Sequence, residues 1–158
     1  MSNQQIVDCS RSQGNAGCSG GSIFSALDYV KSSGLTYRSN YPYHAYEGTC
    51  MNPPSYVRIN DYTKISDCTA LISALHNGPI AVMVDASNMQ FYHGGIFSNC
   101  GTNLNYNMLL TASTYNSFRL KASWGPSWGE GGYIELVKGN TCGVCMNGAS
   151  LNKGWWLV

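Results

Sequence analysis

The most informative stretch of this chain is Ser123-Trp124-Gly125-Pro126-Ser127-Trp128-Gly129-Glu130-Gly131-Gly132-Tyr133-Ile134. Its Gly-rich part is unsuited to a helix, because each glycine costs roughly 0.8–1 kcal/mol there and a proline costs more. We therefore predict a tight loop between two strands, at Phe118–Lys121 and Gly132–Val137. Trp124 and Trp128 are four residues apart on this loop, and large aromatic side chains in such a place usually cover a core edge or form the wall of a cleft.

Periodicity along the chain predicts three helices and several strands. Ser2 and Gln5 form a capping box that opens a short helix through Ile6 and Val7. An apolar stripe of Ile23, Ala26, Leu27 and Val30 predicts a helix over Ser22–Ser33 that ends before Gly34, and Ser66 or Asp67 caps a helix over Thr69–His76. The predicted strands, five or six in number, are Tyr56–Tyr62, Ile80–Asp85, Tyr106–Ser113, Phe118–Lys121, Gly132–Val137 and Trp155–Val158. Arg11–Gly21 and Leu35–Pro54 are predicted to be irregular.

Length and composition set broad limits. The 158 residues fit one ordinary domain or two small ones, with 44% apolar residues for a core and only 11% charged residues. The formal charge of +1 gives no reason to expect nucleic acid or an anionic membrane as partner. No apolar run approaches the ~18 residues of a membrane span, and no basic and apolar leader is recognisable as a signal peptide.

Four motifs, in the same order along the chain, resemble those of papain-family (C1) cysteine peptidases of the cathepsin L-like kind. They are Asp8-Cys9-Ser10 with Gly17-Cys18-Ser19-Gly20-Gly21, then Tyr41-Pro42-Tyr43, then Asn77-Gly78-Pro79-Ile80-Ala81-Val82, and the block at Ser123. The resemblance implies an α+β, papain-like fold. Residues 1–54 would be the remnant of the helical left domain, and residues 55–158 the antiparallel β-barrel right domain.

The resemblance also shows where catalytic residues are expected, and each position departs from the family pattern. The family's opening segment, with its CGSCW-type nucleophile motif, has no counterpart in this sequence, so we expect an N-terminally truncated member or a nucleophile on a separate chain. Tyr106 stands at the position of the family's histidine, and Ala122 at that of its asparagine. A phenol ionises only at alkaline pH in model compounds, whereas imidazole exchanges protons near neutrality.

Losing members of a coupled triad costs roughly 10⁴–10⁶ in rate. The histidines of this chain are His44, His76 and His93, and none is at the family position. The sequence therefore predicts no catalytic residue and no cofactor. Gly20 and Gly21 match the residues whose backbone holds substrate in the family, so that with Trp124 and Trp128 they would line a remnant cleft. For the two tryptophans we favour packing over binding.

The seven cysteines are an odd number, so at least one is unpaired or paired outside the chain. The resemblance implies a disulfide between Cys9 and Cys50, and another from Cys100 to Cys142 or Cys145, with Cys142 preferred. Cys18 would normally pair with the missing segment, and Cys68 has no recognised counterpart. A zinc site at Cys142-x-x-Cys145 would need a second pair of ligands, and we expect no metal.

One competing motif points to a serine hydrolase. Gly17-x-Ser19-x-Gly21 fits a nucleophile elbow, and Asp85 and His93 follow it in the order of a triad. That motif requires a strand directly before the serine. We predict a loop there and therefore disfavour this reading.

We interpret the chain as a catalytically inactive papain-like pseudoenzyme that acts as a structural or protein-interaction subunit of a larger assembly. The alternatives are the C-terminal chain of a cathepsin L-like endopeptidase and an inhibitory or peptide-binding module that uses the remnant cleft. Without the missing segment, residues 1–54 would expose Ile23, Leu27 and Val30, so we expect a protein partner over that face. The family is lysosomal or secreted, but the chain shows no leader, so the sequence leaves the compartment open.

Overall fold

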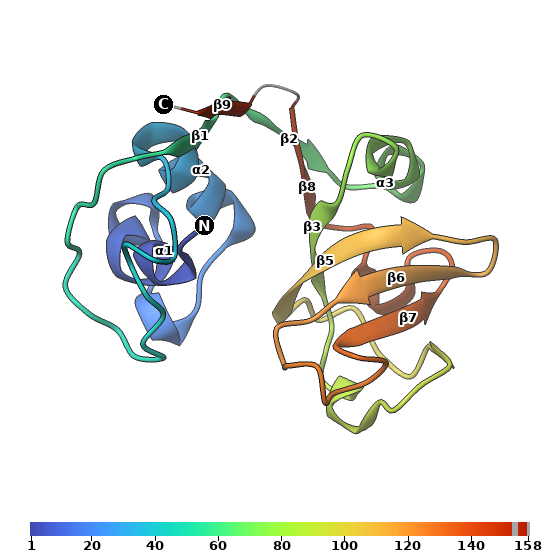
Figure 1. Cartoon of the computed structure of the whole chain (residues 1–158). Coiled ribbons are helices and arrows are strands. Elements are labelled where there is room, and N and C mark those ends of the chain that lie inside the picture. The colour runs from blue at the N-terminus through green and yellow to red at the C-terminus, as the bar shows by residue number, and fades with distance from the viewer. Residues whose placement is uncertain (153–154, 158) are drawn as a thin grey trace. The chain divides into compact units, whose positions relative to one another are not determined.

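The computed structural model describes residues 1–152 and 155–157. The chain divides into two compact units (Figure 1): Met1–Tyr62 with the C-terminal residues from Asn152, and Thr63–Leu151. The first unit continues beyond the boundary that we predicted near Pro54, because strand β1 (Val57–Ile59) pairs with β9 (Trp155–Leu157) and Val57 forms a bridge to Leu35. The assignment of residues 1–54 to the remnant of a papain-like helical domain, and of residues 55–158 to a papain-like β-barrel domain, stays a prediction.

The first unit is built on two helices, α1 (Asn3–Cys9) and α2 (Ile23–Ser33), with 3₁₀ helices at Ser10–Gln13 and Gly17–Ser19 between them. The Ser2 hydroxyl accepts a hydrogen bond from the Gln5 N–H at 3.1 Å, so the predicted N-cap is confirmed. The other half of the predicted capping box, a hydrogen bond from the Ser2 N–H to the Gln5 side chain, is wrong, because the Ser2 N–H donates to the Thr36 carbonyl. The Gln5 side chain turns inward, where it donates to Tyr29 and to the Gly34 carbonyl and accepts from the Thr36 N–H.

Helix α2 begins after Ser22, whose hydroxyl accepts from the Phe24 N–H, and it ends at Gly34, as predicted. Gly34 has φ +73°, and a Cβ at this position would lie 2.9 Å from the Val57 carbonyl oxygen. Only glycine relieves both the conformation and the crowding. Our expectation that α2 would expose Ile23 and Val30 is wrong, because both are buried where the helix packs on β1 and on Ser10–Gln13.

The second unit holds one sheet with the strand order β2-β8-β3-β5-β6-β7-β4. The strands are β2 (Tyr62–Ile65), β3 (Ile80–Val84), β4 (Ile96–Phe97), β5 (Tyr106–Ser113), β6 (Ser117–Lys121), β7 (Tyr133–Val137) and β8 (Gly148–Leu151). Helix α3 (Cys68–Leu75), capped by Asp67, packs on β3, β5 and β8. The sheet is mixed rather than wholly antiparallel, since β4 pairs parallel with β7.

The core of this unit comes from one face of each central strand. In β3, Ile80, Val82 and Val84 are fully buried and alternate with partly exposed residues, as the sequence predicted. Phe118 and Leu120 of β6 and Ile134 and Leu136 of β7 are equally inaccessible. Each such side chain stabilises the fold by roughly 1.5–3 kcal/mol. No helix within the described residues is long and apolar enough to cross a membrane.

Three element predictions need correction. The strand predicted over Tyr56–Tyr62 is two strands, because the chain leaves β1 after Ile59 and enters β2 at Tyr62. Strand β8 was missed, since Gly148-Ala149-Ser150-Leu151 has little apolar alternation. The described residues therefore contain nine strands, more than the five or six expected. The C-terminal strand is present as Trp155–Leu157, and Val158 lies outside the described residues.

Disulfides link distant segments within each unit. The bonds Cys9–Cys50 and Cys100–Cys142 are the pairs that the resemblance implied. A third bond, Cys68–Cys145, was not foreseen, and it joins the start of α3 to a residue 77 positions later. Cys18 is free and exposed. Because Cys142 and Cys145 belong to different disulfides, they are not a pair of thiolate ligands, and the zinc reading fails.

Candidate functional site

The Gly-rich stretch is the loop between β6 and β7, as predicted. Its base is closed by a hydrogen bond from the Ala122 N–H to the Gly132 carbonyl, and its interior by one from the Gly132 N–H to the Trp128 carbonyl. Gly129 has φ +54°, and a Cβ there would lie 2.5 Å from the Tyr133 carbonyl oxygen. The loop therefore depends on a glycine at this point, and this fixes where the two tryptophans project.

Tyr106 lies against this loop because of strand register. Leu109 of β5 pairs with Lys121 of β6, and continuing that antiparallel register places Tyr106 opposite Trp124. The two rings are 4.7 Å apart between centroids. The Tyr106 phenol oxygen lies 2.6 Å from the Ser123 hydroxyl oxygen, and either atom could donate. Tyr106 is thus held by both a ring contact and a hydrogen bond.

Ala122 directly follows β6 and is buried, with 8% of its surface exposed. Its backbone N–H is used to close the loop, and its methyl group packs in the hydrophobic core. A methyl group offers neither donor nor acceptor, so this position contributes packing and cannot orient a neighbouring polar side chain.

Trp124 and Trp128 continue a row of aromatic contacts. Their rings meet edge to face at 4.6 Å, and Trp128 lies 5.7 Å from the Tyr92 ring. The Trp128 indole N–H donates to the Met89 carbonyl at 3.1 Å. Both tryptophans are partly buried against the core.

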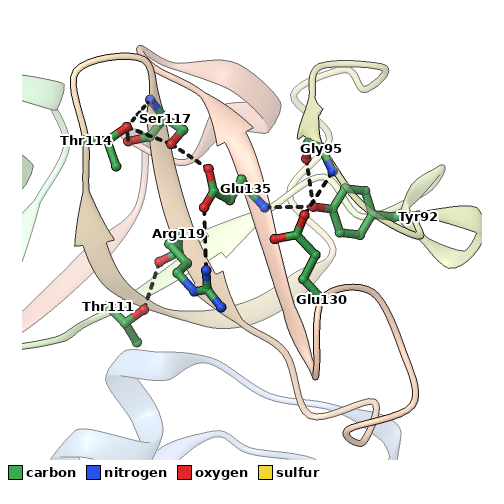
Figure 2. A network of polar contacts seen from close by, with 8 residues as sticks. All are labelled: Tyr92, Gly95, Thr111, Thr114, Ser117, Arg119, Glu130 and Glu135. Carbon is green, nitrogen blue, oxygen red and sulfur yellow. Dashed lines mark hydrogen bonds and ion pairs between the residues drawn. The ribbon is translucent and has the colours of Figure 1, made fainter.

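Beside this row, a polar network joins β6 and β7 to the segment before β4 (Figure 2). The Tyr92 hydroxyl donates to the Gly95 carbonyl at 2.7 Å, and the Gly95 N–H donates to the Glu130 carboxylate at 2.9 Å. Burial raises the pKa of Tyr92, the hydrogen bond from the Glu135 backbone N–H opposes this, and the nearby carboxylate of Glu130 raises it further. On the other side, the Glu135 carboxylate accepts from the Ser117 hydroxyl. The network fixes the turn at Gly95 to the loop that carries Trp128.

The comparisons assign the chain to a family. The family model described as papain family cysteine protease matches residues 1–151. The chain belongs to this family. It is 40% identical to cathepsin L 2 of Paramecium tetraurelia and 38% identical to fruit bromelain of Ananas comosus. Each alignment covers 92% of this chain, but only 47% of the cathepsin and 44% of the bromelain. The chain therefore spans about half the length of the curated relatives it matches.

Solved structures of papain-family proteins share its fold, so the predicted papain-like α+β class is confirmed. The Carica candamarcensis cysteine protease CMS1MS2, solved in complex with E-64, superposes with a TM-score of 0.88 at 31% identity, over 97% of this chain and 77% of that chain. Procathepsin L 3 of the Tenebrio molitor larval midgut gives 0.87 at 35% identity, over 95% and 54%.

The contacts of the three histidines within the described residues involve neither Tyr106 nor Ser123. In the first unit, the His44 ring lies 5.5 Å from the Tyr46 ring, between centroids, in a tilted arrangement. The Nδ1 atom of His76 lies 3.0 Å from the Ile72 carbonyl at the end of α3. His93 lines a cavity before β4. The partner of Tyr106, Ser123, was not singled out from the sequence, although it directly precedes Trp124, which the register of β5 and β6 places opposite Tyr106.

Gly20 and Gly21 lie in the first unit, whereas Trp124 and Trp128 lie in the second. A Cβ on Gly21 would meet the Asn15 Oδ1 atom at 2.2 Å, and that oxygen accepts a hydrogen bond from the Ser22 N–H. Gly21 thus leaves room for the contact that starts α2. A Cβ on Gly20 would meet nothing within 4 Å, although its φ of +110° favours glycine. A cleft that joins these glycines to the tryptophans stays a prediction.

The serine-hydrolase alternative is contradicted by the local structure. Ser19 ends the 3₁₀ helix Gly17–Ser19, and no strand precedes it. Asp85 is buried and accepts hydrogen bonds from the Ser87 hydroxyl and from the Asn103 N–H. The Ser87 bonds, together with those from backbone N–H groups, lower the pKa of Asp85. This carboxylate therefore holds the loop before β5 and does not orient a histidine.

Cys18 is the one cysteine outside a disulfide. Its backbone N–H donates to the Glu47 carboxylate at 3.2 Å, and Glu47 also pairs with Arg11. No histidine contact with its sulfur is present in the part of the chain that the structure describes. Within residues 1–152 and 155–157, no group of three or more His, Cys, Asp or Glu side chains is placed to hold a metal ion.

Proposed function

We propose that this chain is a catalytically inactive member of the papain family, and that it serves as a structural or protein-interaction subunit of a larger assembly. The observation that carries the proposal is the pair of residues at the expected histidine and asparagine positions. Tyr106 and Ala122 occupy them, and both are integrated into the packing of the second unit.

The proposal does not depend on where the nucleophile is encoded. A cysteine could be supplied by another part of the protein or by a second chain. It would still lack an imidazole to accept its proton and an amide to orient that imidazole, which are the roles in a Cys-His-Asn triad. A thiol without a neighbouring cation stays mostly protonated near neutrality. We therefore expect peptidase activity to be reduced by roughly 10⁴–10⁶ relative to an intact triad.

The surface of the first unit supports an interaction role. Tyr43, Tyr46 and Met51 belong to the irregular segment 35–54, and between 55% and 63% of their surfaces are exposed. Met1, ahead of α1, is 45% exposed. Large apolar side chains gathered on one segment mark interaction surfaces more often than isolated ones do. We propose that a protein partner covers this segment.

Two alternatives remain. The named relatives, cathepsin L 2 and fruit bromelain, are about twice as long as this chain, which fits the C-terminal chain of a cathepsin L-like endopeptidase. Tyr106 and Ala122 disfavour it. An inhibitory or peptide-binding module would use Gly20, Gly21, Trp124 and Trp128 as a remnant cleft. The engagement of the Trp128 indole N–H by Met89 disfavours this reading, since that donor is already used.

The test is to purify the chain from its source with everything bound, to record native and denatured intact masses, and to assay hydrolysis of fluorogenic peptides with and without an epoxide that alkylates catalytic thiols. We expect companions in fixed stoichiometry and no epoxide-sensitive hydrolysis. Epoxide-sensitive turnover, with the epoxide attached to a companion that carries a cysteine-bearing segment, would contradict the proposal and establish the two-chain endopeptidase. Peptides recovered with the chain would favour the binding module instead.

A further inference from the structure

A cavity of about 420 Å³ opens between the end of β3 and the end of β4, lined by Asn88, Phe91, Tyr92, His93, Gly94, Phe97 and Asn99. It lies wholly within the second unit. Its volume falls in the range of about 300–1,000 Å³ that is usual for small-molecule sites. It is separate from the Tyr106–Ser123 pair, and nothing in the proposed function uses it.

The segment that encloses the cavity is fixed at both ends. The Asn88 side-chain amide donates to the Asn99 carbonyl at 3.1 Å, which closes the loop on itself. Met89 is fully buried at one end, and the Cys100–Cys142 disulfide follows the other. At the tip, the Glu130 carboxylate accepts from the Gly95 N–H (Figure 2). The cavity is therefore formed before any ligand arrives, so binding would not have to order this loop.

Its lining combines an aromatic platform with neutral polar groups. Phe91 is 76% exposed, although an apolar ring of this size is normally buried. Tyr92 and Phe97 also line the cavity, and their rings pack edge to face at 5.9 Å. Three polar groups line the cavity and make no hydrogen bond to the described residues. They are the His93 ring, the Asn99 side-chain amide and the Asn88 side-chain oxygen. Amide groups both donate and accept hydrogen bonds.

We propose that this cavity binds a neutral pyranose sugar. The C–H face of a pyranose ring would lie on the Phe91 ring, and its hydroxyl groups, which also donate and accept, would bond to Asn88, His93 and Asn99. No Asp, Glu, Lys or Arg side chain lines the cavity, so a charged ligand would have no partner of opposite formal charge. An aromatic side chain of a peptide would use the platform but would make no hydrogen bond to these three side chains, which are exposed and would keep their contacts with water.

The proposal is tested by saturation-transfer difference NMR on the full chain, in the assembly in which it is purified. The probes are methyl β-D-glucopyranoside, methyl α-D-mannopyranoside and methyl β-D-galactopyranoside, with the corresponding trisaccharides to distinguish a glycan from a free sugar. N-acetylphenylalaninamide represents a peptide side chain. We expect saturation at the ring C–H protons of at least one pyranoside, with Phe91→Ala weakening the affinity about tenfold, as is typical for loss of a central aromatic contact.

Matched variants make the result decisive. Tyr115→Ala removes another aromatic ring, 95% exposed, from the turn between β5 and β6, and it should bind the sugar as the wild type does. Phe91→Trp keeps a platform and should retain binding, whereas Asn99→Ala should weaken it. The proposal is overturned if no pyranoside receives saturation at millimolar concentration, if Phe91→Ala and Tyr115→Ala bind equally, or if N-acetylphenylalaninamide alone binds.

Discussion

The phenol oxygen of Tyr106 lies 2.6 Å from the hydroxyl oxygen of Ser123. The first residue begins β5, and the second follows β6, so the bond joins the ends of two paired strands at the loop that carries both tryptophans. With the ring contact to Trp124, it makes Tyr106 part of the support of that loop. Under the proposed function, the position expected for the family's histidine would here stabilise the fold.

This role predicts coupling between the two residues. Tyr106→Phe keeps the ring and removes the hydroxyl, and Ser123→Ala removes the partner. Since the bond is partly exposed, we expect each change to lower the free energy of unfolding by about 0.5–1 kcal/mol. The double variant should lose little more than either single variant, because both remove the same bond. Urea unfolding of the four proteins measures this, and strictly additive losses would show that the bond contributes nothing.

The contact between Glu130 and Gly95 predicts a local effect. Glu130→Ala leaves the Gly95 N–H without its acceptor and should cost about 1 kcal/mol, because hydrogen bonds to charged groups are the stronger ones. Amide hydrogen exchange at Gly95 should accelerate about tenfold. Glu130→Gln retains an acceptor oxygen and is the control. A Gly95 exchange rate in Glu130→Ala equal to that of the wild type would mean that the carboxylate does not hold the turn.

Much of the fold follows from local signals in the sequence. Ser2 and Ser22 cap their helices, Gly34 ends α2, and Ile80, Val82 and Val84 alternate as a half-buried strand must. These features depend on residues close in sequence, so periodicity and capping rules reach them. The glycines around Trp124 and Trp128 likewise identify a loop, because no other element tolerates them.

What could not be predicted depends on residues far apart in the sequence. The Gln5 side chain leaves its capping box for Tyr29 and Thr36, which local rules cannot foresee. The partner of Cys68 is 77 residues away, and pairing of cysteines cannot be deduced from their spacing alone. The contact of Tyr106 with Ser123 needed the β5–β6 register, and the cavity at Phe91 needed a loop closed by Asn88.

The first unit predicts an acid-sensitive stability. Asp8 is buried, and burial alone would raise the pKa of its carboxyl. Hydrogen bonds from the Gly48 N–H, the Tyr41 hydroxyl and the Gln4 side-chain amide outweigh the effect of burial, so that the pKa of Asp8 is lowered. A carboxyl whose pKa is lower in the folded state stabilises the protein at pH values above its pKa in the unfolded state, which is about 3.9. This stabilisation is lost as the pH falls through the pKa of the folded state. Unfolding free energy should therefore decline from about pH 5 downwards.

Variants at this carboxylate separate its contribution from general acid denaturation. Asp8→Asn should be less stable than the wild type near pH 7 by about 2 kcal/mol, because charge-assisted hydrogen bonds are lost, and should depend less on pH between 5 and 2. Tyr41→Phe keeps the carboxylate but removes one donor, so its pH dependence should be intermediate. Parallel curves of unfolding free energy against pH for wild type and Asp8→Asn would rule out this origin of acid sensitivity.

Removal of the unforeseen Cys68–Cys145 bond is expected to cause the largest loss of stability among these tests. Of the three disulfides, it joins the residues that are farthest apart in the sequence, with a separation of 77. Cross-links of this kind restrict the unfolded chain and so stabilise the folded state by about 2–4 kcal/mol. The double variant Cys68→Ala/Cys145→Ala should therefore unfold at clearly lower urea concentration. Cys18→Ala removes the exposed free thiol and should change stability by less than about 0.5 kcal/mol.

Alkylation of the unreduced, unfolded wild type should label one thiol, Cys18. Labelling of three thiols, or a double variant as stable as Cys18→Ala, would show that Cys68 and Cys145 are not bonded in the protein.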